Sequence, residues 1–253
     1  MGTSASSKGP KSSSPLVPPW ADADPNAPLP QPEGQRFRGF RTDFGRVAGG
    51  VAGASLRSAI GKYAREASGG SSVGPRRFGP AYSAGAGLAG LIGELQSGGT
   101  GEAATGVNLS GLIGRPLDYA AQEIARTLAP ENADADKIAA AIQEAMAEAL
   151  PGIETFEPDS ISIDQLVQLL VEFFSRILFQ EITSVAGDAW NKSPGPEKTT
   201  QTEADLLELV RATVDKHLSP RLANGLTALT RAEISALERK AVEEIWREWE
   251  SYE

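Results

Sequence analysis

The sequence predicts an all-α fold: an irregular helical bundle preceded by a disordered N-terminal tail rich in Pro and Ser. From residue 36 onwards, apolar residues recur mostly at steps of three and four, which is the period of an α-helix. We find no convincing strand pattern and no internal repeat. Before residue 36 the chain holds 8 of its 17 prolines, and proline fixes φ and removes a backbone donor.

The composition limits the chemistry that the chain can perform. Its 253 residues are enough for one large domain or two small ones with a buried core. The absence of Cys excludes disulfides, thiolate nucleophiles and zinc sites built on Cys, and the single His excludes a cluster of His ligands. Aromatic residues make up only 6% of the chain, so we expect a core of small side chains. No catalytic residue, metal or cofactor is predicted.

Charge is distributed unevenly along the chain. Residues 1–80 hold 11 Lys and Arg against 5 Asp and Glu, whereas residues 81–253 hold 13 against 28. The net charge of −9 therefore combines a basic front with an acidic rear. Two interpretations stay open: the basic front contacts an anionic partner, or the two halves attract each other.

Residues 1–35 are predicted to form a disordered arm, because they offer few apolar groups to offset the entropy of ordering. The exception is the stretch from Pro15 to Trp20, which reads Pro-Leu-Val-Pro-Pro-Trp. A Trp beside prolines is costly to leave in water, so Trp20 is expected to contact either the body of the protein or a partner.

Residues 36–114 are predicted to form a basic helical region that holds 20 of the 27 glycines. A helix is expected from about residue 42 to Gly69, with a break near Gly49-Gly50. A shorter helix is expected from about Ala81 to Gln96, followed by a Gly-rich connection.

Residues 115–253 are predicted to form an acidic helical region packed with the Gly-rich one. Its expected helices run from Pro116 to Leu128, from about Asp134 to Leu150, from Asp164 through Ile182, from Thr202 through Val214 and from Thr230 through Trp249. The helix that begins at Asp164 is apolar around much of its circumference and is expected to be central. Thr202 with Asp205 and Thr230 with Glu233 resemble capping boxes.

Two patterns suggest chemistry, and in each a structural role is favoured. The stretch Gly85-Ala86-Gly87-Leu88-Ala89-Gly90 matches the dinucleotide pattern G-x-G-x-x-G, which requires a preceding strand and an acidic residue about 20 positions on. Neither is present, so a small-residue face on a helix is favoured. His217 lies near the end of a predicted helix, where it suits the helix dipole, and nothing in the sequence supplies the other members of a triad.

Arginines recur between residues 36 and 77, with Phe37, Phe40 and Phe44 among them. Such a pattern is compatible with nucleic-acid binding, but helical spacing assigns the Phe side chains to the core and the chain as a whole is acidic. Direct nucleic-acid binding is therefore not expected. Contact with an acidic protein partner or with the acidic half is favoured, and the candidate side chains are Arg38, Arg41, Arg76 and Arg77.

The chain starts Met1-Gly2-Thr3-Ser4-Ala5-Ser6. Because Gly2 is small, removal of Met1 is expected to leave a free glycine amine on a flexible arm. The same residues fit the myristoylation pattern M-G-x-x-x-[ST], although no polybasic second signal follows at once. An ordinary disordered terminus is the third interpretation.

This start, continued through Pro15–Trp20, Arg38-Gly39-Phe40-Arg41, Leu56–Tyr63 and Arg76-Arg77-Phe78-Gly79, resembles the QatB family. QatB proteins are components of the Qat anti-phage defence system of bacteria. The resemblance covers roughly the first 95 residues, and the ordered series of motifs carries it rather than any single one. It implies a partner set that comprises a QueC-like enzyme, an ATPase and a TatD-like nuclease. It also implies that the QueC-like partner activates a deazaguanine carboxylate with ATP and joins it to the Gly2 amine.

The chemistry of the arm agrees with that implication. An α-amine has a pKa near 7.7–8, about two units below that of a lysine, and Gly2 has no Cβ beside the nitrogen. The small Thr3 and Ser4 could thread a narrow channel, and the residues expected to contact the partner are Pro10, Leu16, Pro18, Pro19 and Trp20. We therefore predict a non-enzymatic defence component. The alternative is a helical adaptor or scaffold whose tail is only a docking peptide.

No apolar stretch of membrane-spanning length and no signal peptide are found in the sequence. A cytoplasmic protein without a membrane contact is therefore expected.

Overall fold

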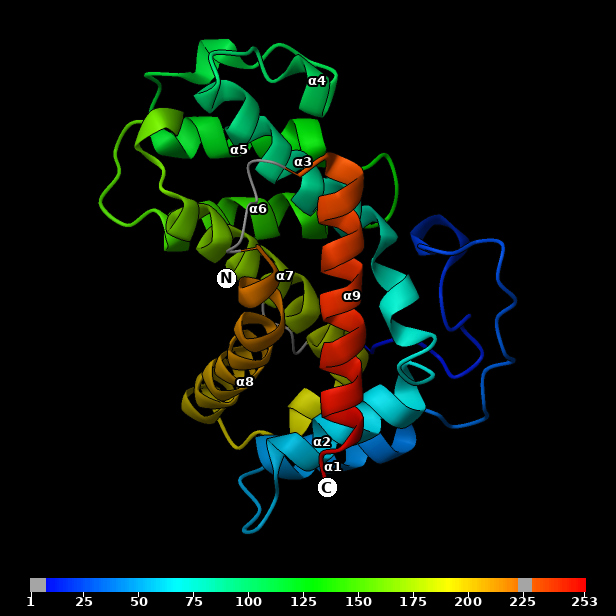
Figure 1. Ribbon diagram of the computed structural model, residues 1–253. Helices are drawn as coiled ribbons and strands as arrows, with labels where there is room; N and C mark the ends of the chain where they lie inside the picture. The colour runs from blue at the N-terminus through cyan, green and yellow to red at the C-terminus, as the bar shows by residue number, and fades with distance from the viewer. Residues whose placement is uncertain (1–7, 223–228) are drawn as a thin grey trace. The chain divides into compact units, whose positions relative to one another are not determined.

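The computed structural model describes residues 8–222 and 229–253. Figure 1 shows helices joined by turns and irregular segments. Among the described residues no strand is formed, and the one β-bridge joins Pro116 to Thr155. The predicted all-α class is confirmed. Gly2, Thr3 and Ser4, which the sequence singles out, lie outside the described residues.

The helices follow the predicted order. The α-helices are α1 (Arg38–Ala48), α2 (Leu56–Lys62), α3 (Gly79–Gln96), α4 (Glu102–Thr105), α5 (Leu117–Leu128), α6 (Ala135–Ala149), α7 (Ile163–Ala186), α8 (Pro196–Leu222) and α9 (Arg231–Glu250). Shorter turns of other helix types are η2 (Pro19–Ala21), η3 (Tyr63–Ala67), η4 (Gly74–Phe78), η5 (Ser110–Leu112), η6 (Pro158–Ser160) and η7 (Gly187–Lys192). The predicted break near Gly49-Gly50 separates α1 from α2.

The chain forms two compact units, and both are discontinuous in sequence. The first unit combines the chain up to Phe78 with Leu178–Ala212 and Val242–Glu253. The second unit combines Gly79–Ile177 with Thr213–Ala241. Helices α7, α8 and α9 therefore contribute residues to both units.

The core of the first unit is aromatic, which differs from the small side chains expected from composition. The ring of Trp190 meets that of Phe44 edge-on, with 4.7 Å between the centroids. Trp246 lies 5.0 Å from Trp249 and 5.5 Å from Phe78, measured in the same way. Because aromatic pairs add about 0.5–1.5 kcal/mol each beyond the area they bury, a few clustered rings can stabilise this unit.

The second unit is built around α3, whose glycines let other helices approach closely. A Cβ added to Gly85 would lie 2.5 Å from a carboxylate oxygen of Glu238 and 3.0 Å from the ring of Phe174. A Cβ added to Gly87 would lie 2.7 Å from Leu128. The G-x-G-x-x-G pattern is thus a helix-packing face, in agreement with the structural interpretation.

The two predicted capping boxes have different outcomes. At the start of α9 the Thr230 amide donates to Glu233 Oε2 at 2.8 Å, and the Glu233 amide donates to Thr230 Oγ1 at 3.3 Å, which confirms the box. The hydrogen bonds that the Thr230 amide and hydroxyl donate to Glu233 Oε2 lower the pKa of Glu233 below its ordinary value. The box at Thr202 is wrong, because its hydroxyl donates to the Lys198 carbonyl within α8. Helix α8 begins earlier, at Pro196, since proline suits the first helical turn.

Within residues 8–222 and 229–253, no helix combines the length and the apolar character that crossing a bilayer requires.

Candidate functional site

The N-terminal arm is the feature that the sequence marks most strongly for function. Its described part, residues 8–35, contacts the rest of the first unit at defined positions. They contain little regular structure besides the short turn η2, as their composition predicts. They differ from a disordered arm because arginines of the first unit donate to carbonyl oxygens that the irregular backbone leaves unpaired. In Figure 1 the arm is the dark blue chain that precedes α1.

Arg41 of α1 fastens the start of the described arm. Its Nη2 donates to the Pro10 carbonyl and its Nε to the Val185 carbonyl, both at 2.8 Å. Its guanidinium also lies 4.8 Å from the centroid of the Phe37 ring. Burial lowers the pKa of Arg41, and the nearby Asp188 acts in the opposite direction.

The backbone of the arm crosses that of η7 at two glycines. Gly9 and Gly187 have φ values of +69° and +50°, in the left-handed region that favours glycine. A Cβ on Gly187 would lie 2.7 Å from the Lys8 carbonyl oxygen, and a Cβ on Gly9 would lie 3.0 Å from that of Ser184. Only glycine permits this approach, so the crossing fixes the position of Lys8 and Gly9 against η7.

The middle of the arm is held by Arg36 and Val17. Arg36 Nη2 donates to the carbonyls of Ser14 and Pro15 at 3.0 and 3.2 Å. Val17 is 1% exposed and is the apolar anchor of this stretch. Trp20 keeps 50% of its surface exposed, so the body leaves it available to a partner.

Arg76 of η4 holds the last part of the arm through hydrogen bonds from Nε, Nη1 and Nη2. Its Nε and Nη2 contact the two carboxylate oxygens of Asp22 at 2.9 and 2.7 Å. Nη2 also donates to the carbonyls of Asp24 and Ala27, and Nη1 to that of Pro28. The hydrogen bond to Asp22 raises the pKa of Arg76 above its ordinary value. The side chains of Arg76 and Asp22 are each 7% exposed.

The four basic residues predicted to meet a partner are thus in different environments. Arg41 and Arg76 are engaged by the arm itself. Arg77 Nη2 lies 3.4 Å from a carboxylate oxygen of Glu181, and both side chains are largely buried. Arg38 is exposed and donates to Gln35. Sequence reasoning did not single out Arg36 or Val17 as contact residues. Their contacts depend on how the arm folds back against residues that are distant in sequence.

Among the residues that the structure describes, no three His, Asp or Glu side chains gather in a way that could hold a metal ion. The arm and the arginines that hold it place one exposed aromatic side chain, that of Trp20, at a fixed position.

Comparison with protein families gives a match to the family described as "Qat anti-phage system associated protein QatB", over residues 69–248. No curated protein and no solved structure matches the chain significantly. The family match and the resemblance noted in the sequence overlap over residues 69–95. The arm lies before the matched range.

Proposed function

Since the chain belongs to the QatB family of anti-phage defence components, we propose that it is a non-enzymatic member of the Qat system that presents its N-terminal glycine to a QueC-like enzyme. Membership of the system supports partners within it, and the ATPase and the TatD-like nuclease are further candidates. The observation that carries the proposal is the set of contacts from Arg36, Arg41 and Arg76. These three arginines hold the arm from Pro10 to Pro28 against the rest of the first unit.

The fixed crossing at Gly9 and Gly187 supports presentation of the residues before it. The described chain begins at Lys8, so seven residues precede it. A chain of that length reaches no further than about 25 Å from its attachment, whatever its conformation. Attachment at a fixed point raises the effective concentration of the amine at an active site within that reach. A partner docked beside the crossing would therefore find its substrate already positioned.

The proposed reaction joins a deazaguanine to Gly2 through an amide. On the partner, a carboxylate oxygen of the deazaguanine attacks the α-phosphate of ATP, which gives the acyl-adenylate and releases pyrophosphate. The Gly2 amine, which Met1 removal exposes, attacks the carbonyl carbon. The C–N bond forms, the C–O bond to AMP breaks, AMP leaves, and the amine loses a proton to solvent. A pKa near 7.7–8 leaves a useful fraction of an α-amine unprotonated at neutral pH.

Intact mass spectrometry of the chain co-expressed with its Qat partners tests this function. We expect the mass to show loss of Met1 and one deazaguanine joined with loss of water. Gly2→Leu, which keeps Met1 in place, should abolish the adduct. Gly34→Leu is the matched control, because a Cβ added there meets no atom within 4 Å. An unmodified Gly2 in cells where the QueC-like enzyme is active would falsify the proposal.

A helical adaptor whose tail is only a docking peptide is the second candidate, and the exposed Trp20 favours it. In that case, deletion of residues 2–7, which spares the Gly9 crossing, would leave partner binding and defence intact. Under the glycine-presentation proposal the same deletion abolishes defence while partner binding persists.

Trp20 is proposed to contact the partner under either function. Trp20→Ala should lower the affinity for the QueC-like enzyme by at least about tenfold, because a half-exposed Trp is the kind of side chain that dominates interfaces. The thermal midpoint should stay unchanged, since Val17 anchors the arm. Surface plasmon resonance with the purified partner measures the affinity, and Val51→Ala, which alters another exposed apolar residue of this unit, is the control. Equal affinities of both variants and the native chain for the enzyme would show that Trp20 is not part of the interface.

A further inference from the structure

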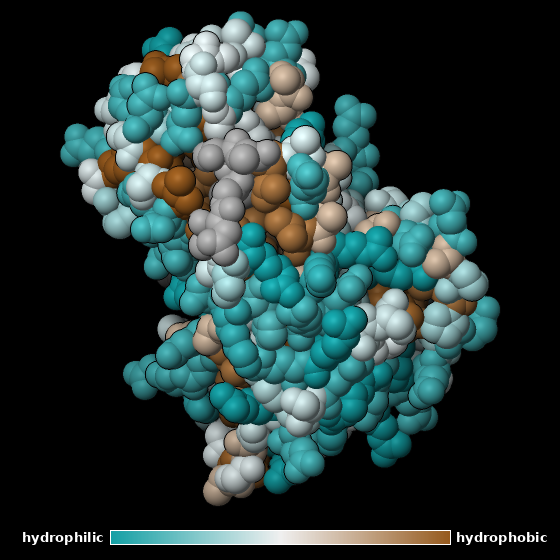
Figure 2. Space-filling view, in the orientation of Figure 1, coloured by the Kyte–Doolittle hydropathy of each residue, from teal (hydrophilic) through white to brown (hydrophobic). Residues whose placement is uncertain are grey.

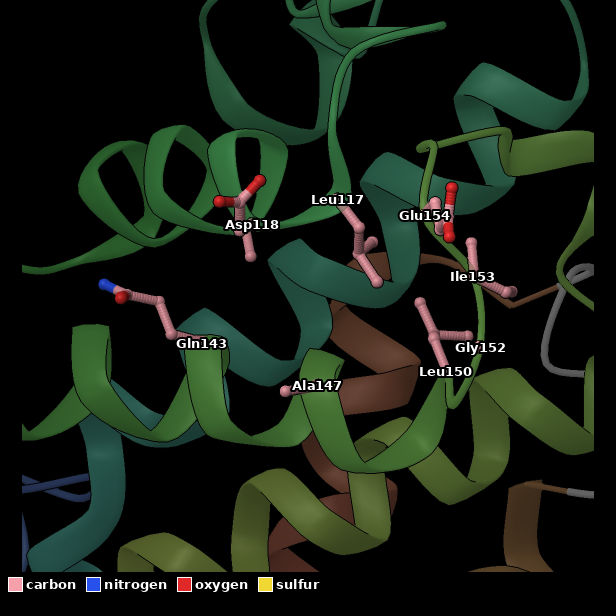
Figure 3. A pocket seen from close by; sticks show the side chains of 9 residues that line it. Leu117, Asp118, Gln143, Ala147, Leu150, Gly152, Ile153 and Glu154 are labelled. Atoms are coloured by element: carbon pink, nitrogen blue, oxygen red, sulfur yellow. The ribbon is translucent and has the colours of Figure 1, made fainter.

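The second unit contains an open groove between α5 and α6, with a volume of about 570 Å³. Figure 3 shows Leu117 and Leu150 pointing into it, with Asp118 and Glu154 at different ends of the α5 side. We name this feature the α5–α6 groove. In Figure 2, hydrophobic residues are exposed at several places in the area that these helices occupy, interspersed with hydrophilic ones.

The groove exists because small side chains stand where the two helices face each other. Ala121 of α5 and Ala147 of α6 both line it, and neither fills the space between the helix axes. The chain after α6 turns at Gly152, whose φ is +76°, and the Leu117 amide then donates to the Glu154 carbonyl at 2.9 Å. This hydrogen bond holds one end of the groove in place.

The edge of the groove is acidic. Asp118 and Glu154 are its charged lining residues, Gln143 adds a neutral polar group, and the lining contains no Lys or Arg. Among the described residues neither carboxylate has an ion-pair partner, and Asp118 accepts only from the Tyr119 amide. Residues 117–157, which include both helices, hold nine Asp and Glu against two Lys and Arg. The groove therefore combines an apolar floor with uncompensated negative charge.

We propose that the α5–α6 groove binds a basic segment of a partner protein, with an apolar side chain in the cavity and a Lys or Arg toward each of Asp118 and Glu154. A neutral apolar segment would cover the two carboxylates without pairing them, which costs free energy, and an acidic one would be repelled. The volume lies within the range of about 300–1,000 Å³ typical of binding pockets, so it can hold a large side chain. The groove belongs to the second unit, whereas the arm belongs to the first, and the proposal does not depend on modification of Gly2.

A synthetic probe tests the chemistry of this surface on the full chain. The probe is a fluorescein-labelled 12-residue peptide with a central Leu-Leu pair flanked by lysines, and its counterpart has Glu in place of every Lys. Fluorescence anisotropy should show saturable binding of the basic peptide, weakening as salt is raised, and none of the acidic one. Equal binding of the two peptides would overturn the proposal.

Variants of the groove locate the binding. Ala147→Trp, which fills the cavity, and the pair Asp118→Asn with Glu154→Gln should each weaken binding at least tenfold. The control pair Glu131→Gln with Asp159→Asn removes two exposed acids outside the groove and should change binding less than twofold. Ala147→Arg is the second test of the same position if the Trp variant fails to fold. Unchanged binding in the folded groove variants would overturn the proposal.

Two further measurements distinguish a partner protein in the groove from a second copy of this chain. Analytical ultracentrifugation that shows a dimer abolished by Ala147→Trp would assign the groove to a second copy of this chain and overturn the partner proposal. In co-expression, Ala147→Trp should reduce co-purification of a Qat partner. The intact mass of Gly2 in the same sample reports separately on the proposed function of the arm.

Discussion

Replacing Arg76 with methionine is expected to lower the free energy of unfolding by about 3–5 kcal/mol and to release the arm around Asp22. Methionine keeps most of the apolar stem of Arg76 but none of its donors. The Asp22 carboxylate, whose side chain is 7% exposed, would lose its contacts of 2.9 and 2.7 Å with the guanidinium and remain buried without that positive charge. The carbonyls of Asp24 and Ala27 would lose donors as well.

Urea denaturation measures this loss, and hydrogen exchange locates it. The Ala23 amide donates to the Arg76 carbonyl at 2.8 Å, so its protection reports whether the arm still lies on η4. Arg126→Met is the matched control, because Arg126 pairs with Glu123 on the exposed face of α5, where solvent screens the pair, and its loss should change stability little. Adding Asp22→Asn to Arg76→Met should recover part of the stability, since the buried negative charge disappears. Equal effects of the Arg76 and Arg126 substitutions would show that the arm is not fastened in this way.

The helices could be predicted from sequence because their signals are local. Apolar spacing and proline placement gave α5, α6 and α7 to within a few residues. The Thr230–Glu233 box was correct because both partners lie within one turn of each other. Thr202 and Asp205 have the same spacing, but the helix starts earlier, at Pro196.

The docking of the arm could not be predicted, because the groups that order it are far away in sequence. Asp22 and Arg76 are 54 positions apart, and nothing near Asp22 in the sequence indicates that a guanidinium will reach its carboxylate. Composition alone therefore predicted disorder for a segment whose backbone carbonyls accept hydrogen bonds from arginines that follow it in sequence. The sequence also pointed to Trp20 rather than Val17 as the apolar contact of the arm, because Trp is the larger apolar side chain. Which of the two is buried depends on tertiary contacts that the local sequence does not contain.

The aromatic core shows a second limit of composition. A low overall percentage of aromatic residues says nothing about their distribution, and Trp190, Trp246 and Trp249 all became buried in the first unit. The α5–α6 groove was missed for a related reason. Alanine is a good helix former wherever it stands, so the sequence does not reveal where two alanines face each other across a gap.

Glu238 of α9 is the site of the last prediction, because its carboxylate is buried in the second unit. The residue is 0% exposed, and within residues 8–222 and 229–253 neither carboxylate oxygen has a hydrogen-bond partner. Its neighbours include Gly85 and the ring of Phe174. Burial raises the pKa of Glu238 well above its ordinary value, so the native state favours the neutral acid. The unfolded state, in which the carboxyl is hydrated, ionises at its ordinary pKa.

This difference determines how stability depends on pH. Below the unfolded pKa of about 4.5 both states bind the proton, and the group imposes no ionisation cost. As pH rises above that value, the unfolded state releases the proton while the native state retains it, so the free energy of unfolding falls by up to about 1.4 kcal/mol per pH unit. Glu238→Met removes both this term and the unpaired polar group. It should raise stability at pH 7 by about 1–3 kcal/mol.

Denaturation of the native chain and of Glu238→Met across pH 4.5–7.5 tests the prediction. The gain should be largest at neutral pH and shrink as pH falls toward the unfolded pKa, because protonation of the unfolded state removes the ionisation term. Glu238→Gln keeps the shape and a polar head without the titration, so it should share the flatter pH dependence but only part of the gain. Glu208→Met, at an exposed position of α8, should change stability by less than about 0.5 kcal/mol. A Met variant that is less stable than the native chain at neutral pH would mean that Glu238 is ionised and paired in solution.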